Sequence, residues 1–375
     1  FIGGTGNDRM TGYSGADTYL YHRGDGQDTI YDYDMLGTGK TDRIVFGAGI
    51  SAADIQATRS DNGAGYHLVL TIIDPTNPAA TDRLTIQNWY HSAPFHIETL
   101  EFADGTIWSE IAIRTKAFVC TAGNDTLAGF AGHDMIQGLA GADNCSGYGG
   151  NDLLHGGADA DVLDGGDGND LLIGGRGDDR LVTGTGADIV AFNRGDGRDT
   201  IVAGAGRDDT ITLGHGIRYA DLEFARSGDD LLLLAGADDR ITLANWYAGS
   251  QGTAILQLVI DGTADYDPAA ADELHQQKVA QFDFGQLALQ FDAARAADPA
   301  LAKWALLPAL ADAFSGGSDT AAIGGGLAYH YAQHDGLAGI PIMTAQATLN
   351  SAQFGTGNDG ILLVGTAPDA SQVLL

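Results

Sequence analysis

Between Cys120 and Ala191 the sequence divides into eight consecutive nine-residue units with no insertion. The units are CTAGNDTLA, GFAGHDMIQ, GLAGADNCS, GYGGNDLLH, GGADADVLD, GGDGNDLLI, GGRGDDRLV and TGTGADIVA. The sixth position is Asp in all eight units, the fourth is Gly in seven, and the eighth is apolar throughout. This strict phase constrains the fold more than any other feature, because such a repeat predicts a stack of short, equivalent structural units.

Each unit has the composition of a tight turn followed by a short strand. Gly adopts positive φ without steric cost and Asp bonds back to nearby backbone, so the first six residues suit a turn. The last three suit a strand whose apolar eighth residue points inward. Two units make one coil of a flattened right-handed β-roll, so equivalent turns recur every 18 residues along each edge. One edge then carries Asp125, Asp143, Asp161 and Asp179, and the other carries Asp134, Asp152, Asp170 and Asp188.

The stacked carboxylates predict bound metal. Carboxylates about one strand spacing apart repel each other strongly unless a cation lies between them. Asp oxygens together with the carbonyl groups of Gly-rich turns form an all-oxygen ligand set, which suits Ca²⁺ better than zinc or copper. Four turns on each edge enclose three gaps, so roughly six interior calcium sites are expected in this block.

Two other interpretations of the block are weaker. A flexible Gly/Asp-rich linker has no need for a phased aliphatic residue at position eight. An EF-hand is suggested by Asp159, Asp161 and Asp164, but no Glu follows at the position that such a loop requires.

A shorter copy of the repeat opens the chain, as GGTGNDRMT at 3–11 and GYSGADTYL at 12–20. Both copies continue similarly, with RGDGQDTI at 23–30 and RGDGRDTI at 194–201, and each continuation fits the repeat once two extra residues are allowed. A further isolated unit, FGTGNDGILL, occupies 354–363. The complete set of predicted calcium ligands is Asp8, Asp17, Asp28, Asp125, Asp134, Asp143, Asp152, Asp161, Asp170, Asp179, Asp188, Asp199, Asp209 and Asp359.

The parallel between the two copies extends beyond the repeats. Residues 42–55 correspond to 209–222, and DRLTIQNWY at 82–90 corresponds to DRITLANWY at 239–247. The chain therefore contains a duplicated unit of roll and β-rich cap. Alternating segments such as HLVLTII and RLTIQNW predict strands in the caps, most simply antiparallel.

Over roughly residues 1–265, most strongly over 120–201, the chain resembles RTX proteins, in which such caps accompany haemolysin-type calcium-binding repeats. The resemblance implies a bacterial protein exported by type 1 secretion, and therefore a secreted or cell-surface location. It also implies an uncleaved C-terminal export signal, whereas residues 355–375 look like another repeat. No secretory signal peptide is visible and Phe1 lies inside a repeat, so we expect a processed or excised chain.

The expected fold is mainly β: two parallel β-rolls (RTX nonapeptide repeats), each followed by a β-rich cap, and then a small helical C-terminal region. The expected boundaries are a short roll at 1–34, a cap at 35–115, the main roll at 116–203, a second cap at 204–265, a helical region at 266–353 and a partial repeat at 354–375. In the helical region, a first helix is predicted from the spacing of Val279, Phe282, Leu287, Leu289 and Phe291. Asp298-Pro299 predicts the start of a second helix, and Ser318-Asp319 the start of a third that extends through Tyr331.

Charge and missing motifs narrow the class of function. The net charge of -31 disfavours nucleic acid and anionic membranes as partners. No run of 18 apolar residues is present, so no span of a membrane is expected. The sequence contains no G-x-S-x-G, H-E-x-x-H or phosphate-binding loop, and we expect no enzyme activity. A catalytic carboxylate pair would nonetheless be hidden among the repeat aspartates.

Three further features each have two interpretations. The Asn-Trp-Tyr segments at 88–90 and 245–247 are expected to close the cores of the caps, the alternative being a sugar-binding platform. His330 and His334, with Asp335 beside them, are expected to be an exposed pair, the alternative being a transition-metal site that lacks an evident third ligand. Cys145 is expected inside the roll and Cys120 in a turn, as two free thiols rather than a disulfide.

Three functions fit these observations. The first, which we favour, is a structural or adhesive module of a surface protein that calcium stiffens, with head-to-tail stacking of residues 354–375 on 1–20 of the next copy as a route to filaments. The second is the non-catalytic folding and export region of an RTX enzyme or toxin. The third is a carbohydrate-binding module that uses Trp89 and Trp246. The expected partners are calcium, other copies of the chain, and a glycan or surface ligand.

Overall fold

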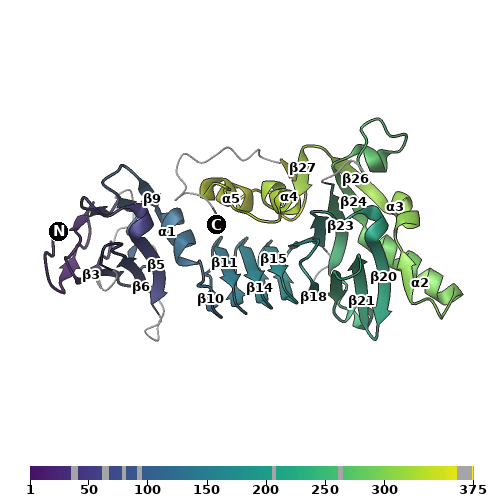
Figure 1. Cartoon of the computed structure of the whole chain (residues 1–375), viewed down its shortest axis with the longest axis horizontal. Helices are drawn as coiled ribbons and strands as arrows, with labels where there is room; N and C mark the ends of the chain where they lie inside the picture. Colours follow the sequence, from purple (N-terminus) through teal and green to yellow (C-terminus); the bar gives the residue numbers. More distant parts are fainter. Residues whose placement is uncertain are drawn as a thin grey trace. The chain divides into compact units, whose positions relative to one another are not determined.

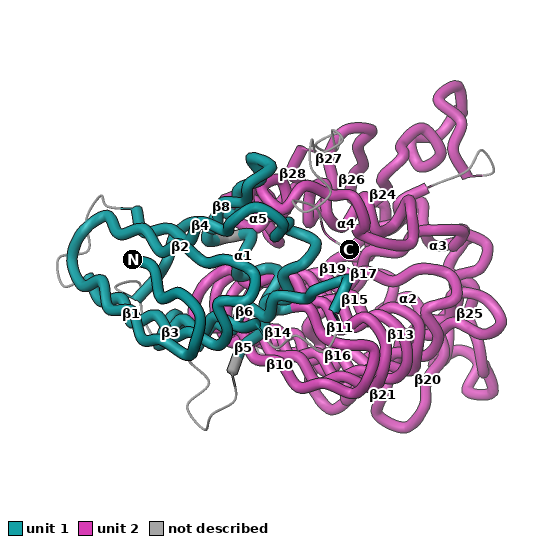
Figure 2. The backbone as a smooth tube through the Cα atoms, turned by 60° about the vertical axis from the view of Figure 1, so that its left-hand side comes forward, with its two compact units in different colours: residues 1–118, 367–373 teal, residues 119–366, 374–375 magenta. Residues whose placement is uncertain are grey.

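The fold is described from a computed structural model, in which residues 1–34, 41–60, 67–77, 82–90, 95–204, 208–260, 265–360 and 374 are placed. The chain forms two compact units, which Figure 2 colours separately. The first comprises residues 1–118 and the second begins at Val119. Each unit contains a roll and a cap, and each is described by itself.

The first unit combines a short roll with its cap in two mixed sheets. The five-stranded sheet has the order β1 (Arg9–Thr11), β3 (Gln27–Tyr31), β7 (Arg83–Ile86), β6 (His67–Ile72) and β5 (Ile55–Ser60). The four-stranded sheet has the order β2 (Thr18–Tyr21), β4 (Arg43–Phe46), β8 (Thr99–Glu101) and β9 (Ile107–Ser109). The helix α1 (Glu110–Ala117) ends the unit, and the Ser109 hydroxyl caps its start by accepting a hydrogen bond from the Ala112 amide.

The second unit begins with the main roll, whose parallel strands form two walls (Figure 1). One wall contains β10 (Thr126–Ala128), β12 (Asn144–Ser146), β14 (Val162–Asp167), β16 (Arg180–Thr185) and β18 (Arg198–Val202). The other contains β11 (Met135–Ala140), β13 (Leu153–Ala158), β15 (Leu171–Arg176), β17 (Ile189–Asn193) and β19 (Asp209–Gly214). Strands of one wall pair in parallel with a shift of 18 residues for each coil, for example Leu153 with Leu171. The predicted parallel β-roll is confirmed.

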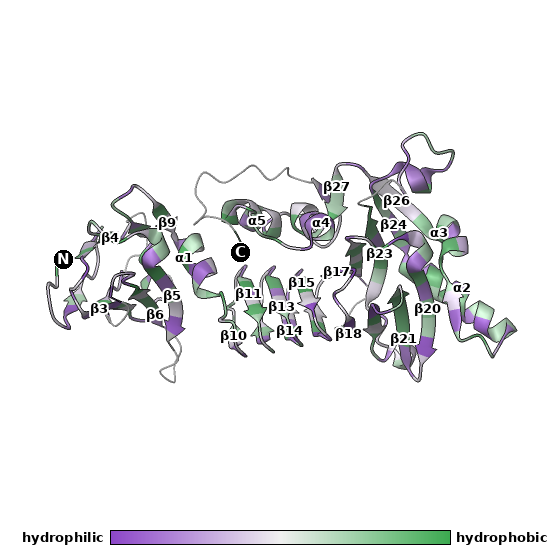
Figure 3. Cartoon of the chain, in the orientation of Figure 1, coloured by the Kyte–Doolittle hydropathy of each residue, from purple (hydrophilic) through white to green (hydrophobic). Residues whose placement is uncertain are grey.

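The core of the main roll consists of the residues at position eight. In one wall Cys145, Leu163, Leu181 and Ile201 lie in register and are buried, and in the other wall Ile136, Leu154, Leu172, Val190 and Ile211 do the same. The strands of the roll accordingly carry hydrophobic colouring in Figure 3. Each coil therefore buries one aliphatic side chain from each wall, and the stack shares a single apolar interior.

The second cap extends both walls of the roll. The strands β22 (Arg240–Leu243), β21 (Asp230–Ala235) and β20 (Leu222–Ser227) continue one wall, and β23 (Thr253–Val259) continues the other. The prediction that cap strands are antiparallel is only partly right. β22 pairs in parallel with β18, and β23 pairs in parallel with β19, whereas β20 and β21 are antiparallel. The first cap strand in each wall therefore continues the parallel pairing of the roll, and the strands after it are antiparallel.

The region predicted to be helical contains four strands as well as helices. Its elements are β24 (Val279–Asp283), α2 (Phe284–Ala297), β25 (Lys303–Ala305), α3 (Leu307–Ala313), β26 (Phe314–Ser318), β27 (Ala321–Ile323), α4 (Gly325–His334) and α5 (Ile342–Leu349). β24 and β26 join the wall that contains β23, and β25 joins the edge beside β20. Val279 and Phe282 therefore belong to a strand, which the helical spacing did not predict.

The predicted starts of the second and third helices are also wrong. Asp298 ends α2, and the next helix begins only at Leu307, with Pro308 in its first turn. Ser318 closes β26, and α4 begins after Gly324, which adopts a φ of 82°. Leu289 is 71 % exposed, so the helical spacing counted a solvent-facing residue as part of the core.

Candidate metal centre

The position-six aspartates form a ladder along each edge of the main roll. In each ladder the backbone N–H of one Asp donates to the Oδ1 atom of the Asp one coil later. On the first edge the N–O distances are 2.7 Å for Asp125–Asp143, 2.8 Å for Asp143–Asp161, 2.7 Å for Asp161–Asp179 and 3.1 Å for Asp179–Asp199. On the second edge they are 2.7 Å for Asp134–Asp152, 2.8 Å for Asp152–Asp170, 2.9 Å for Asp170–Asp188 and 3.2 Å for Asp188–Asp209.

Asp199 and Asp209 thus occupy the next step of the first and second edge. Their spacings from the preceding ladder residue are 20 and 21 residues instead of 18. The extra residues in 183–209 are accommodated in loops, so the ladders continue to the last coil before the cap.

The second carboxylate oxygen has no such partner along most of the ladder. In the described part of the main roll, a buried Oδ2 atom without a hydrogen-bond partner occurs in Asp143, Asp152, Asp161, Asp170, Asp179 and Asp188, and in the first unit the same is true of Asp17 and Asp28. A buried carboxylate oxygen that accepts no hydrogen bond is costly, and these atoms recur on both edges of the three interior coils. A row of such oxygens fits a hard divalent cation such as Ca²⁺, which takes carboxylate and carbonyl oxygens as ligands.

Glycine at position one keeps the space beside these oxygens open. A Cβ atom on Gly147 would lie 2.2 Å from Asp152 Oδ2, and one on Gly156 would lie 2.3 Å from Asp161 Oδ2. Gly174 stands in the same relation to Asp179, at 2.3 Å. The carboxylate therefore faces backbone atoms rather than a side chain, which is the environment that an oxygen-only metal site needs.

Burial and mutual repulsion raise the pKa of the ladder carboxylates. Loss of hydration is the main cause throughout, with neighbouring carboxylates adding to it at most positions. The pKa is raised to about 9 at Asp152, Asp188 and Asp199, to about 7 at Asp161 and Asp170, and to about 6 at Asp179 and Asp209. The fold gathers negative charge that only protons or cations can neutralise.

The first unit repeats the ladder in a shorter form. The Asp8 amide donates to Asp28 Oδ1 at 2.9 Å, and the Asp17 amide donates to Asp42 Oδ1 at 2.7 Å. The Asp42 amide in turn donates to Glu98 Oε2 at 2.6 Å. Ligand atoms of Asp17, Asp32 and Asp42 also lie within 4.8 Å of one another.

Asp32, Asp42 and Glu98 are therefore candidate site residues that the sequence analysis missed. Asp42 could have been found, because it aligns with Asp209 in the internal duplication. Asp32 aligns with Ala203, so the repeat gave no signal for it. Loss of hydration is the first cause of its pKa of about 7, and it accepts a hydrogen bond from the Tyr19 hydroxyl at 2.6 Å.

Asp359 lies apart from both ladders. It belongs to β28 (Asn358–Gly360), which pairs antiparallel with β27. Phe354 is buried, and its carbonyl accepts a hydrogen bond from the Asn169 amide group at 2.7 Å. The repeat motif predicts that residues 354–360 form an open half coil that could receive a second molecule. That prediction is wrong, because these residues pair with β27 and contact the main roll. Residues 361–373 of that motif lie outside the described part of the chain.

The segment after the second cap covers one wall of the main roll, with α4 and α5 beside its strands (Figure 1). Asn151 and Asn169 hold it from the second edge, donating from Nδ2 to the carbonyls of Leu349 and Phe354 at 2.8 and 2.7 Å. At the last coil, Asn193 donates to the Tyr331 carbonyl and the Tyr331 hydroxyl donates to Asp196. We call residues 325–360 the covering segment.

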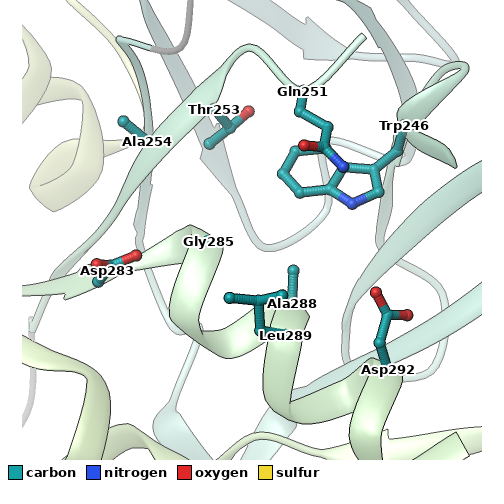
Figure 4. Close-up of a pocket in the computed structure, with 9 residues that line it drawn as sticks. All are labelled: Trp246, Gln251, Thr253, Ala254, Asp283, Gly285, Ala288, Leu289 and Asp292. Atoms are coloured by element: carbon teal, nitrogen blue, oxygen red, sulfur yellow. The ribbon is translucent and has the colours of Figure 1, made fainter. Parts of the chain in front are cut away.

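The two Asn-Trp-Tyr segments mainly complete the cores of the caps, as predicted. Trp89 is fully buried and donates from Nε1 to the Ile97 carbonyl at 3.2 Å. Trp246 is 4 % exposed and stacks edge-on against Phe284, with ring centres 5.3 Å apart. Trp246 nevertheless lines a cavity of about 330 Å³, together with Gln251, Thr253, Ala254, Asp283, Gly285, Ala288, Leu289 and Asp292 (Figure 4).

The two histidine rings on α4 stack against each other. The rings of His330 and His334 are 4.3 Å apart, His334 is exposed, and their Nδ1 atoms contact the carbonyls of Gly336 and His330 respectively. Asp335 accepts a hydrogen bond from the Asn193 side chain and forms an ion pair with Arg176 at 3.6 Å. Within the described residues, these three side chains do not form a cluster of metal-ligand atoms.

Cys120 and Cys145 are free thiols, as predicted, and both are buried. The two thiols are joined by a hydrogen bond. This hydrogen bond, together with burial, raises the pKa of the Cys120 thiol. The repeat predicts Cys120 in a turn and Cys145 inside the roll. The backbone instead bonds Cys120 N–H to the Gln137 carbonyl, which brings its side chain over the first coil.

Comparisons with known proteins agree with this architecture. The family model of the RTX calcium-binding nonapeptide repeat matches residues 1–30, 121–154, 155–190 and 194–214. The model of the haemolysin-type calcium binding protein related domain matches residues 67–110, within the first cap. No described helix has the length and apolar character needed to cross a bilayer.

The iron-regulated protein FrpA of Neisseria meningitidis serogroup C is a relative of part of the chain. It is 33% identical over 124 residues, which make up 32% of this chain and 10% of FrpA. The chain thus spans about a tenth of this relative. The extracellular lipase LipA of Serratia marcescens is a structural match at a TM-score of 0.21 and 18% identity, over 66% of this chain and 38% of LipA. The chain therefore contains several RTX nonapeptide repeats, of the kind that binds calcium and that is typical of secreted proteins, together with a haemolysin-type calcium binding protein related domain.

Proposed function

We propose that the chain is a structural and adhesive module of a bacterial cell surface, and that calcium held by the aspartate ladders makes its rolls rigid. The observation that carries this proposal is the set of buried Oδ2 atoms without a hydrogen-bond partner, one on each edge of every interior coil of the main roll. A divalent cation neutralises two carboxylates and links consecutive coils when bound. The chain's own contribution is to fix each Oδ1 by a backbone N–H and to leave Oδ2 facing the neighbouring turn.

The proposed calcium ligands follow from the ladders. They are Asp8, Asp17, Asp28 and Asp42 in the first unit, and Asp125, Asp134, Asp143, Asp152, Asp161, Asp170, Asp179, Asp188, Asp199 and Asp209 in the second. Asp359 is left out, because it contacts its own strand partner instead of a ladder.

The test is calcium-dependent folding of the whole chain. Circular dichroism in chelator and in millimolar Ca²⁺ should show a large gain of β-structure with calcium, and calorimetric titration should give several ions for each chain. Identical spectra in both conditions would rule out a structural role for calcium. Adhesion needs a separate test, in which the calcium-loaded chain is assayed for binding to whole bacterial or host cells.

A carbohydrate-binding function is the second candidate, and the cavity beside Trp246 is the observation that favours it. Polar groups of Gln251, Thr253 and Asp292 surround the indole in Figure 4, an arrangement that suits a neutral ligand rich in hydroxyl groups. The fully buried Trp89 offers no such surface in the first cap. A glycan array with the wild type and with Gln251→Ala tests this candidate, because a true site predicts a signal that the substitution reduces.

A third candidate is that the chain serves as the folding and export region of a longer enzyme or toxin. The match to only a tenth of FrpA favours it, because the matched stretch there is part of a much longer chain. The sequence that flanks this chain in its gene distinguishes the candidates, since an export region should adjoin a separate catalytic or toxic domain.

A further inference from the structure

Position one of the repeat is glycine in six of the eight units of the main roll. The exceptions are the first unit, which has Cys120, and the last unit, which has Thr183. Since this position lies against the ladder carboxylates, any side chain there enters the space that is otherwise kept for a cation.

Thr183 shows where such a side chain points. Its hydroxyl donates to Asp209 Oδ2 at 3.1 Å, so it contacts the ladder carboxylate of the following coil. The same relation by repeat position pairs Cys120 with Asp143. One ligand atom each from Cys120, Asp125 and Asp143 does lie within 4.8 Å of the other two.

Two further observations describe the donor atoms of this cluster. Asp143 is 2 % exposed, and its Oδ2 atom has no hydrogen-bond partner, while its Oδ1 atom accepts from the Asp125 amide at 2.7 Å. Cys120 is 8 % exposed, and its thiol contacts that of the buried Cys145. One sulfur and two carboxylates thus lie together, with Cys120 and Asp143 buried and Asp125 half-buried.

We propose that the first coil of the main roll holds a soft divalent cation such as Zn²⁺, with the Cys120 sulfur and the Asp125 and Asp143 carboxylates as ligands. Zn²⁺ combines thiolate and carboxylate ligands in tetrahedral sites, whereas thiolate is a poor ligand for Ca²⁺. Ligand atoms of such a site lie about 3.5 Å apart, so a small side-chain rotation closes the cluster around the ion. Binding converts the thiol to a thiolate and releases its proton to solvent.

This site is distinct from the calcium sites of the other coils, although it shares Asp125 and Asp143 with the first ladder. Calcium-dependent folding rests on all of the coils and does not require a sulfur ligand. A failure of one proposal is therefore distinguishable from a failure of the other, because calcium binding is measured by stoichiometry and dichroism and the soft site by a sulfur-specific signal.

The test uses the full chain with reduced thiols in millimolar Ca²⁺, titrated with Cd²⁺ as the probe. A thiolate bound to Cd²⁺ gives an ultraviolet charge-transfer band, which we expect to saturate at about one ion for each chain. Absence of the band, or a band that excess Ca²⁺ removes at stoichiometric Cd²⁺, would overturn the proposal.

Two variants and one control complete the design. Cys120→Gly restores the glycine found in the other units, so it should abolish the band while calcium-induced dichroism is kept. Cys120→Ser keeps a side chain of similar size and should weaken Cd²⁺ binding at least tenfold. The control Thr183→Gly changes the same repeat position at the other end and should leave the band unchanged. A band that persists in Cys120→Gly would show that Cys145 alone binds the ion, which contradicts the assigned ligand.

Discussion

The two edges of the main roll carry the same repeat but differ in their surroundings. Each edge has a ladder of aspartates joined by N–H to Oδ1 hydrogen bonds of the same kind. Only the second edge also bears Asn151 and Asn169, whose side chains hold the covering segment. At the interior coils the pKa rises to about 9 for Asp152 and Asp188 and to about 7 for Asp170 on the second edge, against about 7 for Asp161 and about 6 for Asp179 on the first. At the last coil the order is reversed, with a pKa of about 9 for Asp199 on the first edge and about 6 for Asp209 on the second.

The difference shows that the repeat alone does not set the charge cost of an edge. Both edges place one carboxylate per coil at the same backbone spacing, so the geometry of the ladder is common to them. What differs at the interior coils is burial, since Asp152, Asp170 and Asp188 on the second edge are fully buried and the covering segment is held beside them by Asn151 and Asn169. We therefore expect the second edge to depend more strongly on a bound cation than the first.

Removing calcium has the largest expected effect. In chelator the ladder carboxylates of both edges repel one another, and short strands cannot offset the entropy of ordering the coils. Circular dichroism should show loss of most β-structure from residues 120–209. Hydrogen exchange resolves the edges, and peptides that contain Asp152 and Asp188 should lose protection at a higher free calcium concentration than those that contain Asp161 and Asp179. Simultaneous loss would show that the covering segment does not distinguish them.

Acid should partly replace calcium. The folded-state pKa values of the ladder lie above the ordinary value of 3.8, so the folded roll binds more protons than the unfolded chain. The resulting penalty on folding is absent below about pH 4 and grows as the pH rises to about 9. A chelated sample should therefore regain β-structure as the pH falls from 9 to 5. Calcium affinity should decrease as the pH falls, because protons compete for the same oxygens. A chelated chain that is most structured at pH 9 would contradict the predicted direction.

Single ladder substitutions sharpen the comparison. Asp152→Ala and Asp161→Ala remove equivalent carboxylates from interior coils of the two edges, and each should release about one calcium ion and weaken its neighbours. We expect a loss of stability of about 2–3 kcal/mol in calcium, with the larger value for Asp152→Ala. Asp178→Ala is the matched control, since Asp178 is exposed beside the ladder residue Asp179. Calorimetric titration with thermal melting measures both quantities, and an equal loss of ions in the control would show that general acidity holds the metal.

The sequence predicted the ladders because each carries a local signal. Position six places an Asp after a Gly-rich turn, and position eight places an aliphatic residue inside, so the phase alone locates both. The covering segment has no comparable signal. All of Val279, Ala280, Gln281 and Phe282 are buried in β24, so the strand shows no alternation, and the apolar spacing imitates a helix. The contacts of Asn151 with Leu349 span 198 residues, which no local pattern reports.

The smallest expected effect concerns the docking of the covering segment itself. Asn169 accepts from the Ala187 amide and donates to the Phe354 carbonyl, so Asn169→Ala leaves two groups unpaired and should cost about 1–3 kcal/mol. Asn124→Ala is the matched control on the first edge: Asn124 occupies the same repeat position and accepts from the Ala142 amide. Hydrogen exchange of residues 325–360 in calcium should rise for Asn169→Ala and stay at the wild-type level for Asn124→Ala. Because the two variants remove the same type of side chain from the same repeat position of two different turns, an equal rise in both would mean that the segment is held by its apolar contacts and that the asparagines only complete the turns.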